Sequence, residues 1–153
     1  MLTNMLKIQL LVLFIVGAAV SVTAQDQPLK EALRSMGYTI KGRSTPALRD
    51  WEIRDLKMEG KEVLVVQEVR KRAFDEVFLH RFTVTIEKYN DVADATTRTE
   101  HLRESPPGPH NIRKGFLWRS KVFVVSAASY KYVEDGSLHK FTDDLDWKLW
   151  KVE

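Results

Sequence analysis

The sequence predicts an α+β fold, with a four- or five-stranded, mostly antiparallel sheet and helices packed on one face. Three observations support this class. Between residues 51 and 89 the apolar side chains alternate with polar ones, which is typical of strands. Residues 28–36 and 138–152 instead carry apolar side chains at helical spacing. The predicted neighbouring strands are joined by short turns, and short turns favour antiparallel pairing.

The N-terminal segment has the organisation of a signal peptide. Lys7 gives the polar start one positive charge, and an apolar run extends from Ile8 to Val20. Val22 and Ala24 then stand at the two positions that signal peptidase inspects. We therefore expect residues 1–24 to be removed by cleavage between Ala24 and Gln25. Residues 25–153 would then form one exported domain, periplasmic or secreted.

A retained membrane anchor is the alternative, because a spanning helix needs about 20 mostly apolar residues. The run from Met5 to Val22 approaches that length. The small residues at the cleavage site and the polar residues 25–28 favour removal. The sequence contains no cysteine for lipid attachment and no second apolar segment of spanning length. We expect no membrane association after cleavage.

Length and composition exclude several classes of protein for the mature domain. Its 129 residues can bury a core as a single domain. The full chain has 24 basic and 21 acidic side chains, and removal of Lys7 leaves 23 and 21. Charges of both signs are interspersed along the chain, so no concentrated basic face predicts nucleic-acid binding. The absence of cysteine excludes disulfides, thiol nucleophiles and Cys-ligated zinc, and it favours a bacterial protein.

The first predicted element is a helix over residues 28–36. Pro28 suits its first position, and Gly37 suits the residue after its end. Strands are predicted over residues 51–56, 62–70 and 77–89. In the third strand one face is expected to lie in the core and the other in water. The core face carries Phe78, His80, Phe82, Val84 and Ile86, and the polar face carries Arg81, Thr83, Thr85 and Glu87.

The second half of the chain predicts a helix, a strand and a helix. Asp91 suits the N-cap of a helix that continues to Glu104, where a proline-rich segment ends it. Residues 115–127 predict one strand, whose apolar part at 122–125 indicates a central position in the sheet. The last helix covers residues 138–152, with its core face formed by Leu138, Phe141, Leu145, Leu149 and Val152.

No catalytic or metal-binding motif in the sequence is specific enough to name a reaction. His80 lies between two phenylalanines, and we interpret it as a rim histidine rather than a base or ligand. His101 is expected in solvent, and His110 falls in the proline-rich segment. The acidic run at residues 143–146 lacks the glycine turn of a calcium loop. We expect neither a metal nor a cofactor.

Two tryptophans on the last helix form the candidate site. Trp147 falls opposite the core face and Trp150 about 120° from it, because successive residues turn by about 100°. His139, Asp143 and Asp146 share this flank. Exposed aromatic side chains often mark contact sites. The pair would dock on a partner protein, a second copy or a ligand, unless the loop at 106–109 or the first helix covers it.

A non-enzymatic binding module is the predicted function. One rival is a small extracytoplasmic hydrolase with His80 or His139 as base, which requires a nearby carboxylate in a concave pocket. Another is a structural homodimer formed through exposed strand edges. The polar face of the 77–89 strand would become a site only if the sheet curved into a cleft.

Overall fold

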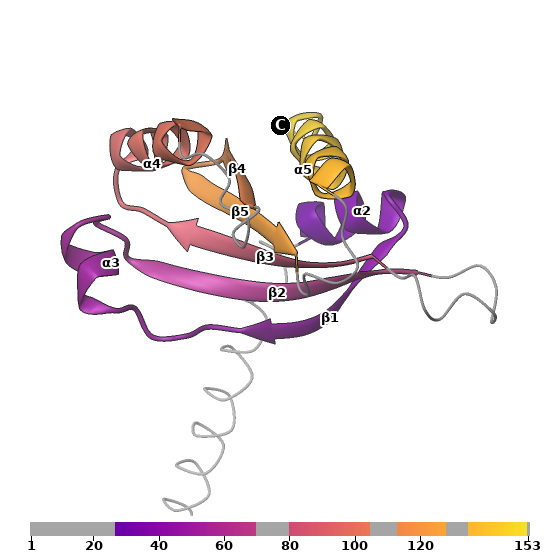
Figure 1. Ribbon diagram of the computed structural model, residues 1–153, viewed down its shortest axis with the longest axis horizontal. Coiled ribbons are helices and arrows are strands. Elements are labelled where there is room, and N and C mark those ends of the chain that lie inside the picture. Colours follow the sequence, from indigo (N-terminus) through magenta and orange to yellow (C-terminus); the bar gives the residue numbers. More distant parts are fainter. Residues whose placement is uncertain (1–26, 70–79, 105–112, 128–134, 153) are drawn as a thin grey trace, which may run out of the picture.

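The computed structural model describes residues 27–69, 80–104, 113–127 and 135–152 (Figure 1). The predicted signal peptide, its cleavage site between Ala24 and Gln25, and His110 lie outside these ranges. The described elements, in chain order, are α2 (Gln27–Ser35), β1 (Tyr38–Ser44), α3 (Asp50–Arg54), β2 (Gly60–Glu68), β3 (Arg81–Lys88), α4 (Val92–Glu104), β4 (Arg113–Trp118), β5 (Lys121–Ala127) and α5 (Asp135–Trp150).

The five strands form one sheet in the order β1-β2-β3-β5-β4. Every neighbouring pair is antiparallel. The predicted α+β class and antiparallel sheet are therefore confirmed. The apolar run in β5 lies inside the sheet, between β3 and β4, as its two apolar faces predict. Its buried side chains are Val122, Phe123, Val124 and Val125.

The single strand predicted over residues 115–127 is wrong, because this segment is a hairpin of β4 and β5. Arg119 and Ser120 form its two-residue turn and both have positive φ, 47° and 58°. Such turns usually carry Asn-Gly or Asp-Gly. This turn has neither, so no local pattern indicates a break between the two strands.

The strand predicted over residues 51–56 is also wrong, and an unpredicted edge strand, β1, precedes it. Residues 50–54 form the short helix α3, where Trp51 is 43% and Ile53 is 54% exposed. The buried residue is Glu52, whose carboxylate accepts hydrogen bonds from Lys61 Nζ at 2.6 and 2.8 Å. The alternating pattern therefore reflects an anchored glutamate and not an apolar face.

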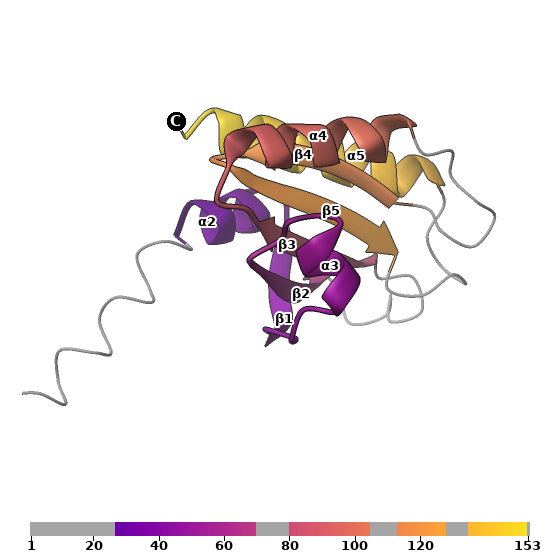
Figure 2. The same ribbon diagram turned by 90° about the vertical axis from the view of Figure 1, so that its left-hand side faces the viewer.

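The helices cover both faces of the sheet. α2 and α5 pack on one face, where Phe82 of β3 stacks on Phe141 of α5 with ring centroids 4.3 Å apart. α4 packs on the opposite face of β4 and β5 (Figure 2). The prediction of helices on one face thus holds for α2 and α5 but not for α4. Because β5 is apolar on both faces, its second face is also buried, and α4 packs against it.

A close approach between α4 and β4 depends on Gly115. A Cβ atom at this position would lie 2.6 Å from Leu102 Cδ1 and 3.2 Å from the Phe123 carbonyl oxygen. Both distances are shorter than ordinary contact, so a side chain here would force the Leu102 side chain to move and would crowd the Phe123 carbonyl group.

The predicted faces of the helices and of β3 are largely confirmed. Gly37 ends α2 with φ +83°, and the Asp91 carboxylate accepts a hydrogen bond from Ala93 N at 2.8 Å. Val152 is 45% exposed and does not share the core face of α5. Glu87 was predicted in water but is buried, because Arg98 of α4 lies over it. The predicted core side chains of β3 and α5 are buried, namely Phe82, Val84, Ile86, Leu138, Phe141, Leu145 and Leu149. The helices α2 and α4 add Leu29, Ala32, Leu33, Ala95 and Leu102 to the buried side chains.

Candidate functional site

Trp147 and Trp150 form an exposed ridge on α5, which we call the tryptophan ridge. Trp147 is 54% and Trp150 is 62% exposed. Their rings stack with centroids 5.4 Å apart and planes inclined by 20°. Lys151 Nζ lies 4.7 Å from the centroid of the Trp147 ring. The alternative in which the N-terminal helix covers both indoles is therefore wrong, whereas residues 106–109 lie outside the described residues.

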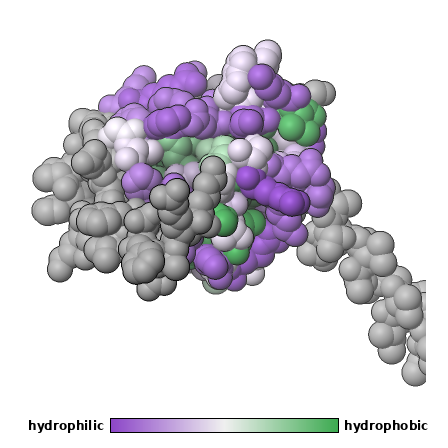
Figure 3. Space-filling model, turned by 90° about the vertical axis from the view of Figure 1, so that its right-hand side faces the viewer, coloured by the Kyte–Doolittle hydropathy of each residue, from purple (hydrophilic) through white to green (hydrophobic). Residues whose placement is uncertain are grey.

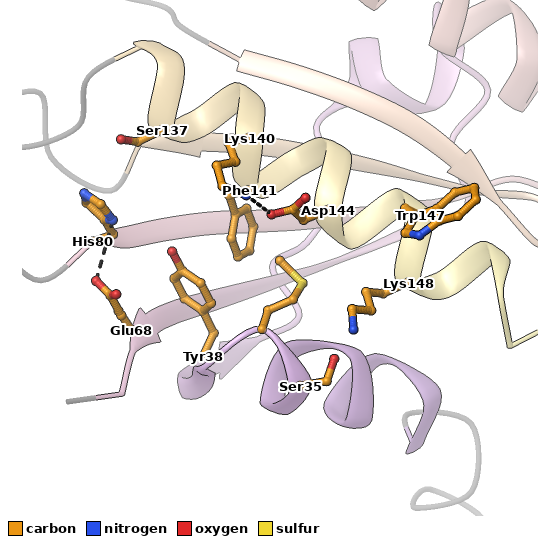
Figure 4. A pocket seen from close by; sticks show the side chains of 11 residues that line it. Ser35, Tyr38, Glu68, His80, Ser137, Lys140, Phe141, Asp144, Trp147 and Lys148 are labelled. Carbon is orange, nitrogen blue, oxygen red and sulfur yellow. Dashed lines mark hydrogen bonds and ion pairs between the residues drawn. The ribbon is translucent and has the colours of Figure 1, made fainter. Parts of the chain in front are cut away.

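A cleft of about 490 Å³ adjoins the ridge, between α5 on one side and α2 with the ends of β1, β2 and β3 on the other. Figure 3 looks onto this side of the molecule, where a hollow with an apolar floor is bordered by hydrophilic side chains. Figure 4 shows Trp147 at one end of the cleft and His80 with Glu68 at the other. Its lining residues are Ser35, Met36, Tyr38, Glu68, His80, Ser137, Lys140, Phe141, Asp144, Trp147 and Lys148.

The ends of the strands position the polar groups of this cleft. His80 directly precedes β3, and its Nδ1 atom lies 3.6 Å from Glu68 Oε2, which belongs to the last residue of β2. This separation is longer than a hydrogen bond. Both side chains are about two-fifths exposed, at 38% and 42%. His80 therefore lies at the rim of the apolar face, as predicted.

Tyr38 places a phenol in the middle of the cleft, against the ring of Phe141 at a centroid distance of 4.8 Å. Burial raises the pKa of Tyr38 to about 12, and the negative charges of Glu68 and Asp144 add to this effect. The hydroxyl is protonated at neutral pH, as any phenol with a pKa of 10 or more is, and it can donate a hydrogen bond to a ligand. Across the cleft, Lys140 Nζ donates to the Asp144 carboxylate at 2.7 Å.

The structure separates the residues that the sequence placed together. Trp147 lines the cleft, whereas His139, Asp143 and Asp146 line a different groove of about 400 Å³ between α4, β4 and α5. Asp143 forms an ion pair there with Lys114. Trp147 stands at the outermost position of α5, one helical turn from Asp143, so the cleft and the groove lie on either side of this exposed strip of the helix. They do not form one site.

Comparison with known proteins gives no match. No family model matches the chain, and neither a curated protein nor a solved structure matches it.

Within the described ranges, no group of three or more His, Asp or Glu side chains could hold a metal ion. None of the described helices combines the length and apolar character that a bilayer crossing requires. The polar face of β3 does not line the cleft. On that face the Glu87 carboxylate accepts hydrogen bonds from Arg98 Nε and Nη2 at 2.9 and 3.0 Å.

Sequence reasoning missed most of the cleft. Tyr38 lies in a strand that was not predicted, and Glu68 meets His80 only through the pairing of β2 with β3. Lys140 and Asp144 were visible on α5 as an i, i+4 pair of opposite charge. That spacing is common on solvent-exposed helices and so gave no specific sign of a cleft.

Proposed function

We propose that this chain is a small exported binding module, and that the tryptophan ridge and its adjoining cleft dock on a partner protein. The observation that carries this proposal is the exposure of two stacked indoles, 54% and 62%, one of which, Trp147, also lines the cleft. Export rests on the predicted cleavage between Ala24 and Gln25. N-terminal sequencing of the protein from its own host tests it, and a start at Gln25 is expected.

The physical case for docking rests on how much apolar area the ridge leaves in water. Burial of apolar surface stabilises a complex by roughly 25 cal/mol per Å². Tryptophan contributes large contact area with few rotatable bonds, which is why it is enriched at binding hot spots. Stacking Trp147 on Trp150 further restricts both rings before any partner arrives. The ridge is thus an ordered apolar surface.

The surroundings of the ridge match the polar rim of a protein interface. Lys140, Lys148, Asp144 and Glu68 place both signs of charge around the cleft. A mixed rim of this kind favours specific contacts with a polar protein surface over one uniformly charged ligand. The protonated Tyr38 hydroxyl supplies a donor inside it.

The test compares Trp147→Ala with Trp51→Ala in the mature protein, residues 25–153. Trp51 is a matched control because it is also an exposed tryptophan, 43%, but lies on α3. Each protein is isolated from its native envelope or medium, and its size and co-purifying proteins are determined. We expect Trp147→Ala alone to lose the partner while keeping the wild-type unfolding free energy. Retention of the partner by Trp147→Ala, or a large loss of stability, would contradict the proposal.

A hydrolase is the second candidate, and the approach of His80 to Glu68 inside the cleft favours it. A carboxylate that orients a histidine is a common base arrangement, and catalytic contacts often tighten when substrate binds. Chromogenic ester and phosphoester substrates test this candidate in the His80→Gln and Glu68→Gln variants. His101→Gln is the control, because His101 is exposed on α4 and lies outside the cleft. Turnover lost in the first two variants alone would support it, and no turnover by the wild type would exclude it for these substrates.

A further inference from the structure

A second groove, whose lining includes neither tryptophan of the ridge, lies along the outer edge of β4. Within the described residues β4 is an edge strand, paired only with β5. α4 packs on one face of β4 and α5 on the other, and both contact β4 more than β5 (Figures 1 and 2). The strand edge therefore forms the floor between two helical walls. The residues that line this groove are Leu102, Arg103, Arg113, Lys114, Gly115, Phe116, His139, Thr142, Asp143 and Asp146.

The main chain of β4 offers hydrogen-bonding groups to this groove. Trp118 and Lys121 flank the two-residue turn and pair with one another. Because an antiparallel ladder alternates, the N–H and C=O groups of every second residue point away from the partner strand. In β4 these residues are Arg113, Gly115 and Leu117. Such an edge is a template for an added strand.

The charges around the groove are asymmetric. On the α5 side, Asp143 is neutralised by its ion pair with Lys114. On the α4 side, neither Arg103 nor Arg113 forms an ion pair within 4.0 Å among the described residues, and Asp146 of α5 interacts with Arg103 only at longer range. The wall next to α4 is therefore the more positive one.

We propose that this groove binds an extended acidic peptide, which adds to β4 as a sixth strand. Side chains of an added strand alternate between the two faces of the sheet. Every second side chain would thus face the α4 wall, where Arg103 and Arg113 select for glutamate or aspartate. The other side chains would face α5. The recognised pattern is an acidic residue at alternate positions.

A second copy of this chain fits the edge less well. Symmetric pairing of β4 with another β4 would bring the α4 and α5 of both copies to the same edge. Since both helices pack mainly against β4, the two pairs of helices would collide. A single extended peptide carries no helices and enters between the walls.

Two peptides of equal length test the proposal on the mature protein, one alternating glutamate with valine and one alternating lysine with valine. Each is titrated while the backbone amide resonances are followed by NMR. We expect the glutamate peptide to bind at least about tenfold more tightly, with the largest shifts at Gly115 and Leu117. Equal affinity for both peptides, no binding of the glutamate peptide, or shifts confined to other elements would overturn the proposal.

A variant and a modified peptide sharpen the test. Arg113→Glu should weaken binding of the glutamate peptide by about tenfold. Arg34→Glu should leave binding unchanged, because Arg34 is exposed on α2 and lies outside the groove. N-methylation of the glutamate peptide at alternate backbone nitrogens removes donors without touching the protein. One methylation register should abolish binding and the other should not, because only one register points at β4. Equal tolerance of both registers would exclude strand addition.

Discussion

Trp118 of β4 holds the C-terminal end of α5 in place, because its indole Nε1 donates a hydrogen bond to the carbonyl oxygen of Leu149 at 3.1 Å. Both residues are buried. The last carbonyl groups of a helix lack intrahelical donors, so a side-chain donor at this point supplies a missing partner. The edge strand that forms the floor of the groove thus also anchors the helix turn that carries the tryptophan ridge.

Replacement of Trp118 by phenylalanine should lower the free energy of unfolding by about 1–3 kcal/mol, because a buried hydrogen bond is lost and the smaller ring leaves space. Urea denaturation followed by circular dichroism measures this change. Trp51→Phe is the control, since Trp51 is exposed and should change stability by no more than about 0.5 kcal/mol. We also expect faster amide exchange at Lys151 and Val152. An unchanged exchange rate there would show that Trp118 does not anchor this end of α5.

Removal of one partner of the buried ion pair beneath α4 should strongly lower the free energy of unfolding, and removal of the second partner should restore most of it. Glu87 and Arg98 are only 6% and 11% exposed in their side chains, and Tyr89 donates to Glu87 at 2.8 Å. Arg98→Leu leaves a buried carboxylate without its cation, and such losses are about 3–5 kcal/mol. The double variant Glu87→Gln/Arg98→Leu removes both charges and keeps an acceptor for Tyr89. We expect it to recover most of the stability in urea denaturation, and a double variant no more stable than Arg98→Leu would contradict this.

Local periodicity predicts those parts of this fold in which neighbours in sequence share a face. The alternation in β3 and the helical spacing in α5 depend on side chains a few residues apart, and the core positions Phe82 and Leu145 are found in this way. The exposure of Trp147 follows from the same periodicity, since it stands opposite the core face. The tryptophan ridge was therefore predictable.

Contacts between distant segments were not predictable from such patterns. The turn at Arg119 and Ser120 adopts positive φ without glycine, so only pairing of β4 with β5 reveals it. Tyr38 and His80 enter the cleft from strands whose order no local pattern fixes. Glu52 mimics an inward strand position because Lys61, nine residues away, neutralises it. In each case a tertiary contact outweighs local preference.

Asp146 in the β4 groove predicts a stability that depends on pH. Burial raises the pKa of its carboxyl above the ordinary 3.8, Asp143 adds to the rise, and Arg103 and Lys114 oppose it. Below pH 3.8 the group is protonated in both states. As pH rises through that value the unfolded chain ionises first, so the free energy of unfolding falls until the folded carboxyl also ionises. Ionised Asp146 therefore destabilises the neutral-pH fold.

Asp146→Asn should accordingly stabilise the protein at neutral pH relative to the wild type, and this advantage should shrink toward pH 3.8. Urea denaturation at several pH values measures the difference. Glu100→Gln on the exposed side of α4 controls for the loss of one negative charge. A constant difference at all pH values would show that the effect comes from packing and not from ionisation.

Tyr38 predicts a second pH dependence, at alkaline pH and inside the cleft. Its pKa is about 12 in the folded protein, against an ordinary 10.0. Below pH 10 the phenol is neutral in both states and contributes no pH dependence. Between pH 10 and pH 12 the unfolded chain loses this proton while the folded chain keeps it, so the free energy of unfolding falls as pH rises.

Tyr38→Phe removes this proton and should flatten the decline between pH 10 and pH 12. Tyr89, whose pKa is also raised by burial and by Glu87, contributes equally in both proteins and cancels from the difference. Tyrosinate absorbance of the folded proteins gives an independent readout, because the variant should lack a component that titrates near pH 12. If the two titration curves coincide, the Tyr38 hydroxyl does not titrate near pH 12, and it is not buried against Glu68 and Asp144.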